Sequence, residues 1–218
     1  MELKIRKLLF CLCLVTGLLT FLAGCPATSV RAEPKGMAYF TWFDTVSYIY
    51  SYAEDSDDTF QTNCKTAAAV LDRYHRLFDI YHEYTGVTNL ATLNREAGGE
   101  ALEVDPELVD FLLYAKEMYT RTDGKMNIMM GAVLGLWHDC RENALQDPQN
   151  ARIPDRTALE RAAAHTDQNT LEIDAGRHTV RITDPEASID VGALAKGYAT
   201  ERAARQLEAA GVYGYVLN

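Results

Sequence analysis

The sequence predicts an α+β fold in which a mixed sheet is flanked by helices. Apolar residues recur at helical spacing near residues 61–81, 105–122 and 194–210. Aromatic and β-branched residues gather instead in short runs at residues 38–52 and 171–182, as in strands. The two kinds of segment do not alternate regularly along the chain, which separates this pattern from that of a doubly wound parallel sheet.

The composition is ordinary for a single globular domain. The chain has 218 residues, of which 48% are hydrophobic and 24% are charged. It carries 21 basic and 31 acidic residues, and its formal net charge is −10. A protein that binds nucleic acid by neutralising phosphates needs the opposite sign, so no nucleic-acid partner is expected.

Residues 1–24 are expected to form a lipoprotein signal peptide. A short charged head precedes an almost wholly apolar run over residues 8–22, which is short for a membrane span but suits a signal-peptide core. The run ends in Leu-Ala-Gly-Cys, which resembles a bacterial lipobox. We therefore expect Cys25 to become the lipidated first residue of the mature chain, at the extracytoplasmic face of the cell membrane or the periplasmic side of the inner membrane. A plain signal peptide and an uncleaved anchor are the alternatives.

Residues 25–37 are expected to form a tether, followed by a domain over residues 38–218. The aromatic run at residues 38–52 predicts one or two strands, and an acidic turn follows at residues 55–58. A helix is predicted from Gln61 because apolar residues then recur at helical spacing. This apolar stripe consists of Val70, Leu71, Tyr74, Leu77, Phe78 and Tyr81.

Residues 85–99 show no periodic pattern and are expected to form a loop. A second helix is predicted from Asp105, since aspartate caps a helix and Pro106 suits its first turn. The Asp-Gly pair at residues 123–124 ends this helix. A further short helix is predicted over residues 154–165.

The last third of the chain mixes strands with one long helix. Residues 171–182 predict a hairpin, and residues 187–191 predict a strand. A helix over residues 194–210 leads to a final strand at residues 212–217. A helical crossover of this length predicts that the final strand lies parallel to, and beside, the strand that contains Ile189.

The cysteines and histidines do not form a recognisable site. Cys64 and Cys140 remain outside the expected signal peptide and lipidation site, and they either pair in an oxidising compartment or stay free. No Cys-x-x-Cys pair indicates zinc. The histidines lie in scattered contexts and are interpreted as surface or structural residues. They are His75, His82, His138, His165 and His178.

The clearest chemical signal lies between Ser188 and Ala199. A strand would deliver Asp190 to its carboxyl end, and Gly192 allows a tight turn. Lys196 and Gly197 then fall in the first turns of a helix, where free N–H groups and the positive helix end attract an anion. The segment predicts a phosphate site; a helix start packed by small residues, with Lys196 in solvent, is the alternative.

Three other segments suit a flat ring or a hydrophobic core. Residues 122–137 contain three methionines and a tryptophan, a soft surface that could cover a ring or pack in the core. Tyr81 follows a helix and could stack on a base. Residues 41–45 form an aromatic strand that serves either as core or as platform.

These segments, in this order, resemble the ApbE family, the FAD:protein FMN transferases. The corresponding stretches are residues 41–45, 79–94, 122–137 and 190–200, and the resemblance covers residues 38–218. It implies an ApbE-like architecture, related to the T-fold. It also implies an enzyme that moves FMN from FAD to a Thr or Ser hydroxyl of a target flavoprotein and releases AMP. A divalent metal, usually Mg²⁺, would assist. The implied targets are flavoprotein subunits of membrane redox complexes or extracytoplasmic reductases.

The resemblance also assigns roles to individual positions. The main-chain carbonyl of Ala193 is expected to bind the metal, whereas catalytic groups are expected beyond residue 218. The residues expected to contact FAD are Phe43, Tyr81, Lys125, Met126, Asn127, Asp190 and Lys196.

The sequence departs from the family pattern at several of these positions. Phe43 and Asp44 stand where the family has Met-Gly, Asn127 replaces an aspartate, and Ala193 replaces a glycine. The family pattern also continues past Asn218 with further metal ligands, so the chain is expected to be the first part of a transferase domain. A Mg²⁺-dependent FAD pyrophosphatase and a non-catalytic flavin-binding lipoprotein remain as alternatives.

Overall fold

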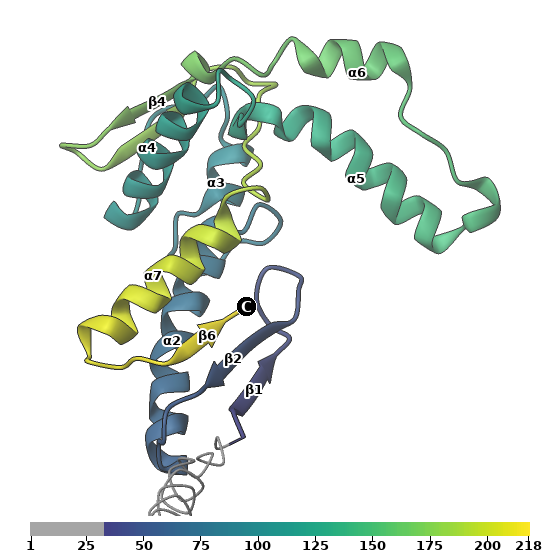
Figure 1. Cartoon of the computed structure of the whole chain (residues 1–218). Helices are drawn as coiled ribbons and strands as arrows, with labels where there is room; N and C mark the ends of the chain where they lie inside the picture. The colour runs from purple at the N-terminus through teal and green to yellow at the C-terminus, as the bar shows by residue number, and fades with distance from the viewer. Residues whose placement is uncertain (1–32) are drawn as a thin grey trace, which may run out of the picture.

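The computed structural model of the chain describes residues 33–218 (Figure 1). The expected signal peptide, Cys25 and most of the expected tether lie outside the described residues. Within residues 33–218, no helix combines the length and apolar character needed to cross a bilayer.

Two helices that pack side by side form the spine of the molecule (Figure 1). Helix α2 (Asp57–Phe78) begins four residues before the predicted Gln61, because the Ser56 side chain accepts a hydrogen bond from the Thr59 amide and so caps the helix there. Helix α7 (Ala195–Ala209) presents mainly alanines to α2, and these small side chains allow the two helices to approach closely. Its buried residues are Ala195, Ala199, Ala203 and Leu207.

A first sheet covers one end of this helix pair. It contains β1 (Lys35–Tyr39), β2 (Ser47–Ser51) and β6 (Tyr215–Leu217) in the order β1-β2-β6, with both pairings antiparallel. Ile49 lies opposite both Met37 and Leu217 and is buried. The predicted parallel pairing of the last strand with the segment around Ile189 is therefore wrong.

A second sheet lies at the other end of the spine. Strands β4 (Leu171–Asp174) and β5 (Thr179–Ile182) form the predicted hairpin, and the short β3 (Leu102–Glu103) joins it in the order β3-β5-β4. Helix α4 (Pro106–Arg121) begins as predicted, with the Asp105 side chain accepting from the Glu107 amide. Its Phe111 packs on Phe78 of α2, with ring centroids 4.0 Å apart.

Two segments differ from the predicted elements. The expected loop at residues 85–99 contains a short helix, α3 (Leu90–Arg95), which Asn89 caps through its side chain. Residues 187–191 form no strand, because their main-chain hydrogen bonds go elsewhere. The Ile189 main chain binds the Asn94 side chain, and the Asp190 amide donates to the carbonyl of Ile128.

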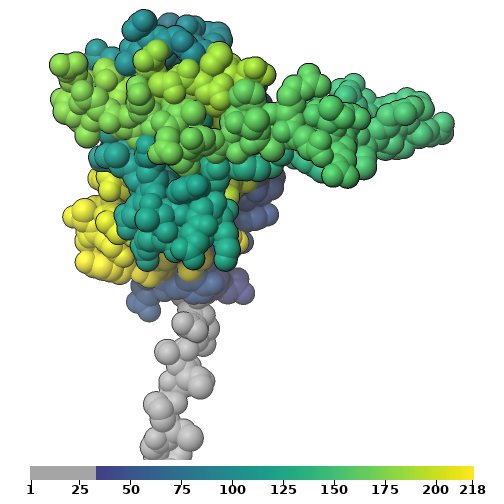
Figure 2. Space-filling model, turned by 90° about the horizontal axis from the view of Figure 1, so that it is seen from above, coloured from purple at the N-terminus to yellow at the C-terminus, as the bar shows by residue number. Residues whose placement is uncertain are grey.

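A helical arm projects from the body, as both views show (Figures 1 and 2). It starts after the 3₁₀ turn η1 (Ile128–Met130) and consists mainly of α5 (Gly131–Gln146) and α6 (Arg156–Ala163). Two further 3₁₀ turns follow these helices along the chain: η2 (Pro148–Asn150) after α5 and η3 (Gln168–Thr170) after α6. The methionine-rich segment of the sequence therefore supplies the root of this arm.

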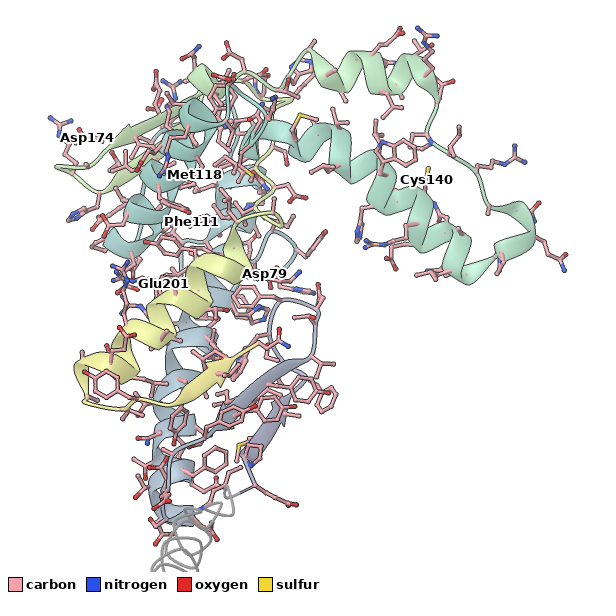
Figure 3. All side chains as sticks on the ribbon, in the orientation of Figure 1. Asp79, Phe111, Met118, Cys140, Asp174 and Glu201 are labelled. Carbon is pink, nitrogen blue, oxygen red and sulfur yellow. The ribbon has the colours of Figure 1, made fainter. Side chains whose placement is uncertain are left out.

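The predicted α+β class is confirmed, but its strands form two small antiparallel sheets instead of one mixed sheet. Both described cysteines are free. Cys64 is buried on α2, whereas Cys140 lies on the projecting helix α5 (Figure 3). The two sites are in different parts of the molecule, which leaves no disulfide between them.

Candidate functional site

A cleft of about 730 Å³ lies where the spine, the first sheet and the arm meet. Four residues predicted from the sequence to contact FAD line it together, although they are spread over the whole domain. They are Phe43, Tyr81, Asp190 and Lys196. Further side chains of the wall come from the end of α2, the loop after it, and α5.

The loop that carries Phe43 has an unusual backbone. Phe43 and Asp44 have φ angles of 54° and 50°, in the left-handed region, and the Thr45 amide closes the turn on the carbonyl of Trp42. A left-handed residue other than glycine costs about 1–2 kcal/mol. Trp42 is buried and stacks on Tyr39, with centroids 4.6 Å apart, which anchors the loop. The glycine of the Met-Gly pattern would adopt this backbone without strain.

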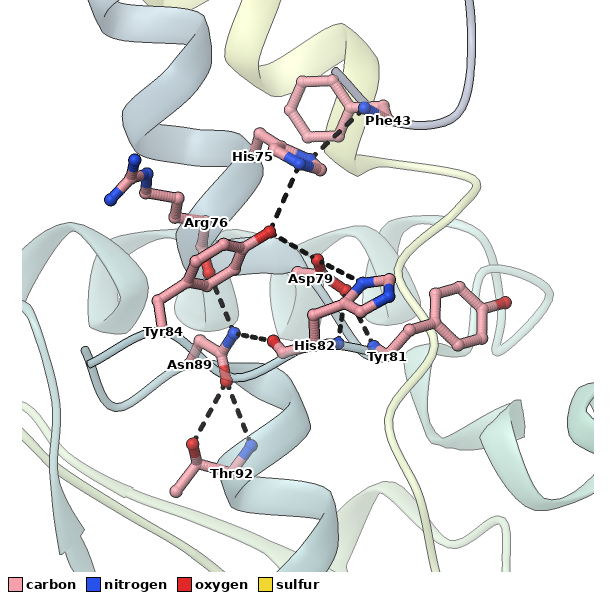
Figure 4. Close-up of polar contacts among 9 residues, drawn as sticks. All are labelled: Phe43, His75, Arg76, Asp79, Tyr81, His82, Tyr84, Asn89 and Thr92. Atoms are coloured by element: carbon pink, nitrogen blue, oxygen red, sulfur yellow. Dashed lines mark hydrogen bonds and ion pairs between the residues drawn. The ribbon is translucent and has the colours of Figure 1, made fainter. Parts of the chain in front are cut away.

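The main chain of Phe43 is held by a histidine of α2. Its N–H donates to Nδ1 of His75 at 3.3 Å, and the two rings meet edge to face with centroids 5.5 Å apart (Figure 4). Phe43 is half-buried, and its side chain forms part of the cleft wall. Its main chain is held by the hydrogen bond to His75.

The other aromatic wall depends on the carboxylate of Asp79, whose side chain is only 4% exposed. It accepts from the amides of Tyr81 (2.8 Å) and His82 (3.0 Å), from the Tyr84 hydroxyl (2.8 Å) and from the His82 ring (Figure 4). Burial raises the pKa of the Asp79 carboxyl, but these hydrogen bonds outweigh burial and keep the pKa below its usual range. Burial, together with this carboxylate, raises the pKa of Tyr84 to about 12.

Asn89 clamps the same loop from its far end. Its buried amide donates to the carbonyls of Arg76 and His82, and its oxygen accepts from the amide and hydroxyl of Thr92. Its side chain thus binds the end of α2, the loop itself and the first turn of α3. The loop is thus fixed at both ends.

Tyr81 projects from this clamped loop toward the arm. Its ring is 53% exposed and stacks on His138 of α5, with centroids 5.0 Å apart. Burial, followed by the nearby Asp190 carboxylate, raises the pKa of the Tyr81 hydroxyl. The tyrosine therefore presents a neutral, largely accessible ring to the cleft.

Asp190 and Lys196 form the polar side of the cleft. The Asp190 carboxylate accepts from the Gly192 amide at 2.8 Å, which shapes the turn before α7. Lys196 is exposed, and among the described residues the main-chain N–H groups of Lys196 and Gly197 have no acceptor. A helix N-terminus with free N–H groups and a lysine suits an anionic group such as a phosphate.

The stretch from Lys125 to Asn127 does not line the cleft. The side-chain amide of Asn127 binds other residues of the protein. Its oxygen accepts from Met129 N and from Gln168 Nε2, and its nitrogen donates to the Thr166 carbonyl. The Met126 amide donates to a threonine hydroxyl, and Lys125 is exposed. In this structure the stretch therefore fastens the root of the arm.

The described residues do not by themselves form a magnesium site. Ala193 is exposed beside the cleft, but Mg²⁺ requires six oxygen ligands, and no group of three His, Cys, Asp or Glu residues that could hold a metal occurs in residues 33–218. A single carbonyl therefore does not make a Mg²⁺ site.

Sequence reasoning missed the residues that support the walls. His75, Asp79 and Tyr84 hold the two aromatic residues in place, which is one of the two roles expected for the histidines, but the sequence does not connect these three residues with the cleft. One signal was present: an aspartate directly after a helix commonly accepts from the amides two and three residues on, as Asp79 does. No sequence spacing indicates that His75 meets Phe43.

Comparisons with known proteins show what the chain is similar to. A model described as "ApbE family" matches residues 43–218. Among curated proteins named FAD:protein FMN transferase, the one from Klebsiella pneumoniae (strain 342) is 24% identical over 206 residues, which is 93% of this chain and 57% of that protein. The one from Treponema pallidum (strain Nichols) is 30% identical over 125 residues, 55% of this chain and 33% of that protein. The chain thus spans less than two thirds of either relative.

Solved structures show the same fold. An ApbE protein from Thermotoga maritima has a TM-score of 0.65 at 24% identity, covering 81% of this chain and 53% of that one. The flavin transferase ApbE from Vibrio cholerae has a TM-score of 0.69 at 17% identity, covering 85% and 57%. At these identities the likeness concerns the fold alone.

Proposed function

Since the chain belongs to the ApbE family, we propose that it takes part in moving FMN from FAD to a Thr or Ser hydroxyl of a target flavoprotein, with release of AMP. The relatives named FAD:protein FMN transferase support this proposal. The observation that carries it is the cleft, which gathers two aromatic side chains, a carboxylate and a lysine at a helix N-terminus.

Each part of this cleft matches a part of FAD. The rings of Phe43 and Tyr81 offer apolar faces for a flat aromatic group. Lys196 and the free N–H groups beside it suit the negatively charged pyrophosphate. Asp190 can accept a hydrogen bond from a ring N–H or a ribityl hydroxyl.

In the proposed reaction, the oxygen of the acceptor hydroxyl attacks the phosphorus of the FMN half of FAD. A bond forms between that oxygen and phosphorus, and the bond from phosphorus to the bridging oxygen breaks, so AMP leaves with the electron pair. The hydroxyl proton passes to solvent or a base. Lys196 would bind and orient the pyrophosphate, and Mg²⁺ would supply further charge neutralisation if other ligands complete its site.

We also propose that lipid on Cys25 holds the protein at the extracytoplasmic face of the membrane. The apolar run and the Leu-Ala-Gly-Cys sequence support this placement. It would bring the enzyme near its proposed targets, which are flavoprotein subunits of membrane redox complexes or extracytoplasmic reductases.

One set of assays separates the proposed activities. Flavin fluorescence measures FAD binding, and chromatography measures AMP and FMN, with and without Mg²⁺ and an acceptor protein that carries the target Thr or Ser. AMP release that depends on the acceptor supports the transferase. AMP and free FMN without an acceptor support the pyrophosphatase, and FAD binding without AMP supports a binding protein. No FAD binding under any condition would overturn all three.

A further inference from the structure

One chain of hydrogen bonds joins the two aromatic walls of the cleft (Figure 4). The Phe43 N–H donates to His75 Nδ1 at 3.3 Å, and His75 Nε2 lies 3.4 Å from the Tyr84 hydroxyl. That hydroxyl donates to Asp79 Oδ2 at 2.8 Å, and Asp79 Oδ1 accepts from the Tyr81 amide at 2.8 Å. The segments around Phe43 and Tyr81 are thus connected through a single histidine.

The donors and acceptors in this chain fix the protonation of His75. Because Asp79 is ionised and only accepts, the Tyr84 hydroxyl must donate to it, which leaves the Tyr84 oxygen to accept from Nε2–H of His75. The Phe43 amide can only donate, so Nδ1 of His75 must carry no proton. The arrangement therefore requires the neutral Nε2–H tautomer, since a proton on Nδ1 would face the Phe43 N–H.

The contact at Nδ1 restrains a strained segment. Phe43 and Asp44 both hold left-handed φ angles, a conformation that persists only where neighbouring groups impose it. Among the described residues, two hydrogen bonds hold the main chain of this segment. One closes the turn from the Thr45 amide to the Trp42 carbonyl, and the other joins the Phe43 amide to His75. Loss of that bond would release Phe43 from its place in the wall.

We propose that neutral His75 is a positioning residue of the cleft and that its protonation uncouples Phe43 from Tyr81, making FAD affinity fall at acidic pH. The proposal rests on the proposed function for the identity of the ligand, but the histidine contact can be measured without FAD.

The elements around His75 carry several charged groups. The carboxylate of Asp79 lies beyond Tyr84, whose ring also meets the His75 ring edge to face, and Arg76 of the same helix lies over the Tyr84 ring. The remaining charged groups belong to α2 or to the walls of the same cleft. These groups are Asp72, Asp44, Arg141, Glu142, Asp190, Lys196 and, when protonated, His82.

Two substitutions of His75 distinguish its role as a hydrogen-bond acceptor from its ability to gain a proton. In His75→Asn, the amide oxygen takes the place of Nδ1 and cannot be protonated in this pH range. His75→Leu removes the acceptor. FAD dissociation constants are measured at pH 8.0 and at pH 5.5. His178→Asn serves as the matched control, because His178 is exposed in the β4–β5 turn and its φ of 51° suits asparagine.

At pH 8.0, we expect His75→Asn to bind FAD within about two-fold of the wild type and His75→Leu to bind about five-fold more weakly, as for the loss of one hydrogen bond. At pH 5.5, the wild type and His178→Asn should weaken by about five-fold, whereas His75→Asn should change by less than two-fold. Equal pH dependence in the wild type and His75→Asn would overturn the proposal.

Amide hydrogen exchange by NMR tests the contact independently of FAD. The Phe43 amide should exchange slowly in the wild type and in His75→Asn at pH 8.0, and about five-fold or more faster in His75→Leu, after correction for intrinsic rates. If the wild type binds no FAD, the proposed function fails while this measurement still decides the role of His75. Unchanged Phe43 exchange in a folded His75→Leu variant refutes the positioning role.

Discussion

The side-chain amide of Asn94 forms two hydrogen bonds with the main chain of Ile189, 95 residues further along the sequence. Asn94 Nδ2 donates to the Ile189 carbonyl at 2.9 Å, and the Ile189 amide donates to Asn94 Oδ1 at 2.7 Å. The asparagine thus replaces a neighbouring strand for this segment. It also fixes the residue directly before Asp190, which lines the cleft.

Substitution Asn94→Ala should therefore lower the free energy of unfolding by about 2–3 kcal/mol, since two hydrogen bonds are lost and a buried segment keeps unpaired main-chain groups. Urea denaturation measures the change. Asn143→Ala, at an exposed position on α5, is the control and should change stability by less than about 0.5 kcal/mol. Equal effects of the two substitutions would contradict the role assigned to Asn94.

Glycine at position 131 is required by a close approach between chain segments. A Cβ added there would lie 2.5 Å from both the carbonyl oxygen and the hydroxyl oxygen of Ser188, whereas one added at Gly135 would meet no atom within 4 Å. We expect Gly131→Ala to destabilise the protein by about 1–3 kcal/mol and Gly135→Ala to stabilise it by up to about 1 kcal/mol. Thermal unfolding of both variants checks this opposite pair of effects.

The low pKa of Asp79 makes its contribution to stability dependent on pH. A carboxyl group whose pKa is lower in the folded state stabilises the protein above its unfolded pKa of about 3.9 and loses that contribution as pH falls through the folded value. Asp79→Asn should thus lower the free energy of unfolding by about 2–4 kcal/mol at pH 7 and by less at pH 3.

Urea denaturation at pH 7 and at pH 3 measures this difference for Asp79→Asn. Asp72→Asn, on the exposed face of α2, is the control and should change stability by less than about 1 kcal/mol at either pH. A destabilisation by Asp79→Asn that stays constant between the two pH values would argue against an ionised Asp79 in the folded protein.

Lys196 is predicted to bind the FAD pyrophosphate. Lys196→Ala should weaken FAD binding by about ten- to a hundred-fold, because a charge-assisted contact is lost. Fluorescence titration measures this, with circular dichroism to verify folding. Lys65→Ala, an exposed lysine on α2, provides the matched loss of charge away from the cleft. If both variants bind FAD as the wild type does, Lys196 does not contact the ligand.

The lipid anchor is tested by expression in a bacterium. Wild-type protein should be processed and found with membranes, and Cys25→Ser should give an unprocessed or soluble form, because the signal peptidase and the lipid both require the cysteine. Metabolic labelling with a fatty acid and membrane fractionation measure the two properties. A processed Cys25→Ser protein that still partitions into membranes would rule out lipidation at this residue.

The sequence predicts correctly those helices and strands whose signals lie within a few consecutive residues. The apolar stripe of α2, the capped start of α4 and the β4–β5 hairpin each follow from residues close together in sequence. Local patterns do not connect residues that are far apart in the sequence. The resemblance to a family does, because it implies one site that contains Phe43, Tyr81, Asp190 and Lys196. The structure places all four residues around one cleft.

Features that depend on distant partners could not be predicted. The segment around Ile189 has the composition of a strand, but the side chain of Asn94 occupies the hydrogen-bonding positions that a second strand would need. The last strand then pairs with β2 instead, after a turn at Gly214 whose φ is 77°. The sequence likewise does not indicate that the side-chain amide of Asn127 binds Thr166 and Gln168.

Because α5 is fixed at its first residue, Gly131, a small rotation there moves the far end of the helix by a larger distance. The helix is about 24 Å long, and its root is fixed where the Gly131 amide donates to the Ser188 carbonyl. Arg141, which lines the cleft, lies about 15 Å from that root, so a rotation of only about 10° there would displace it by about 3 Å. The substitution Gly131→Ala would thus have two effects. It would lower stability through the contact with Ser188, and it would change the width of the cleft about 15 Å away, at Arg141.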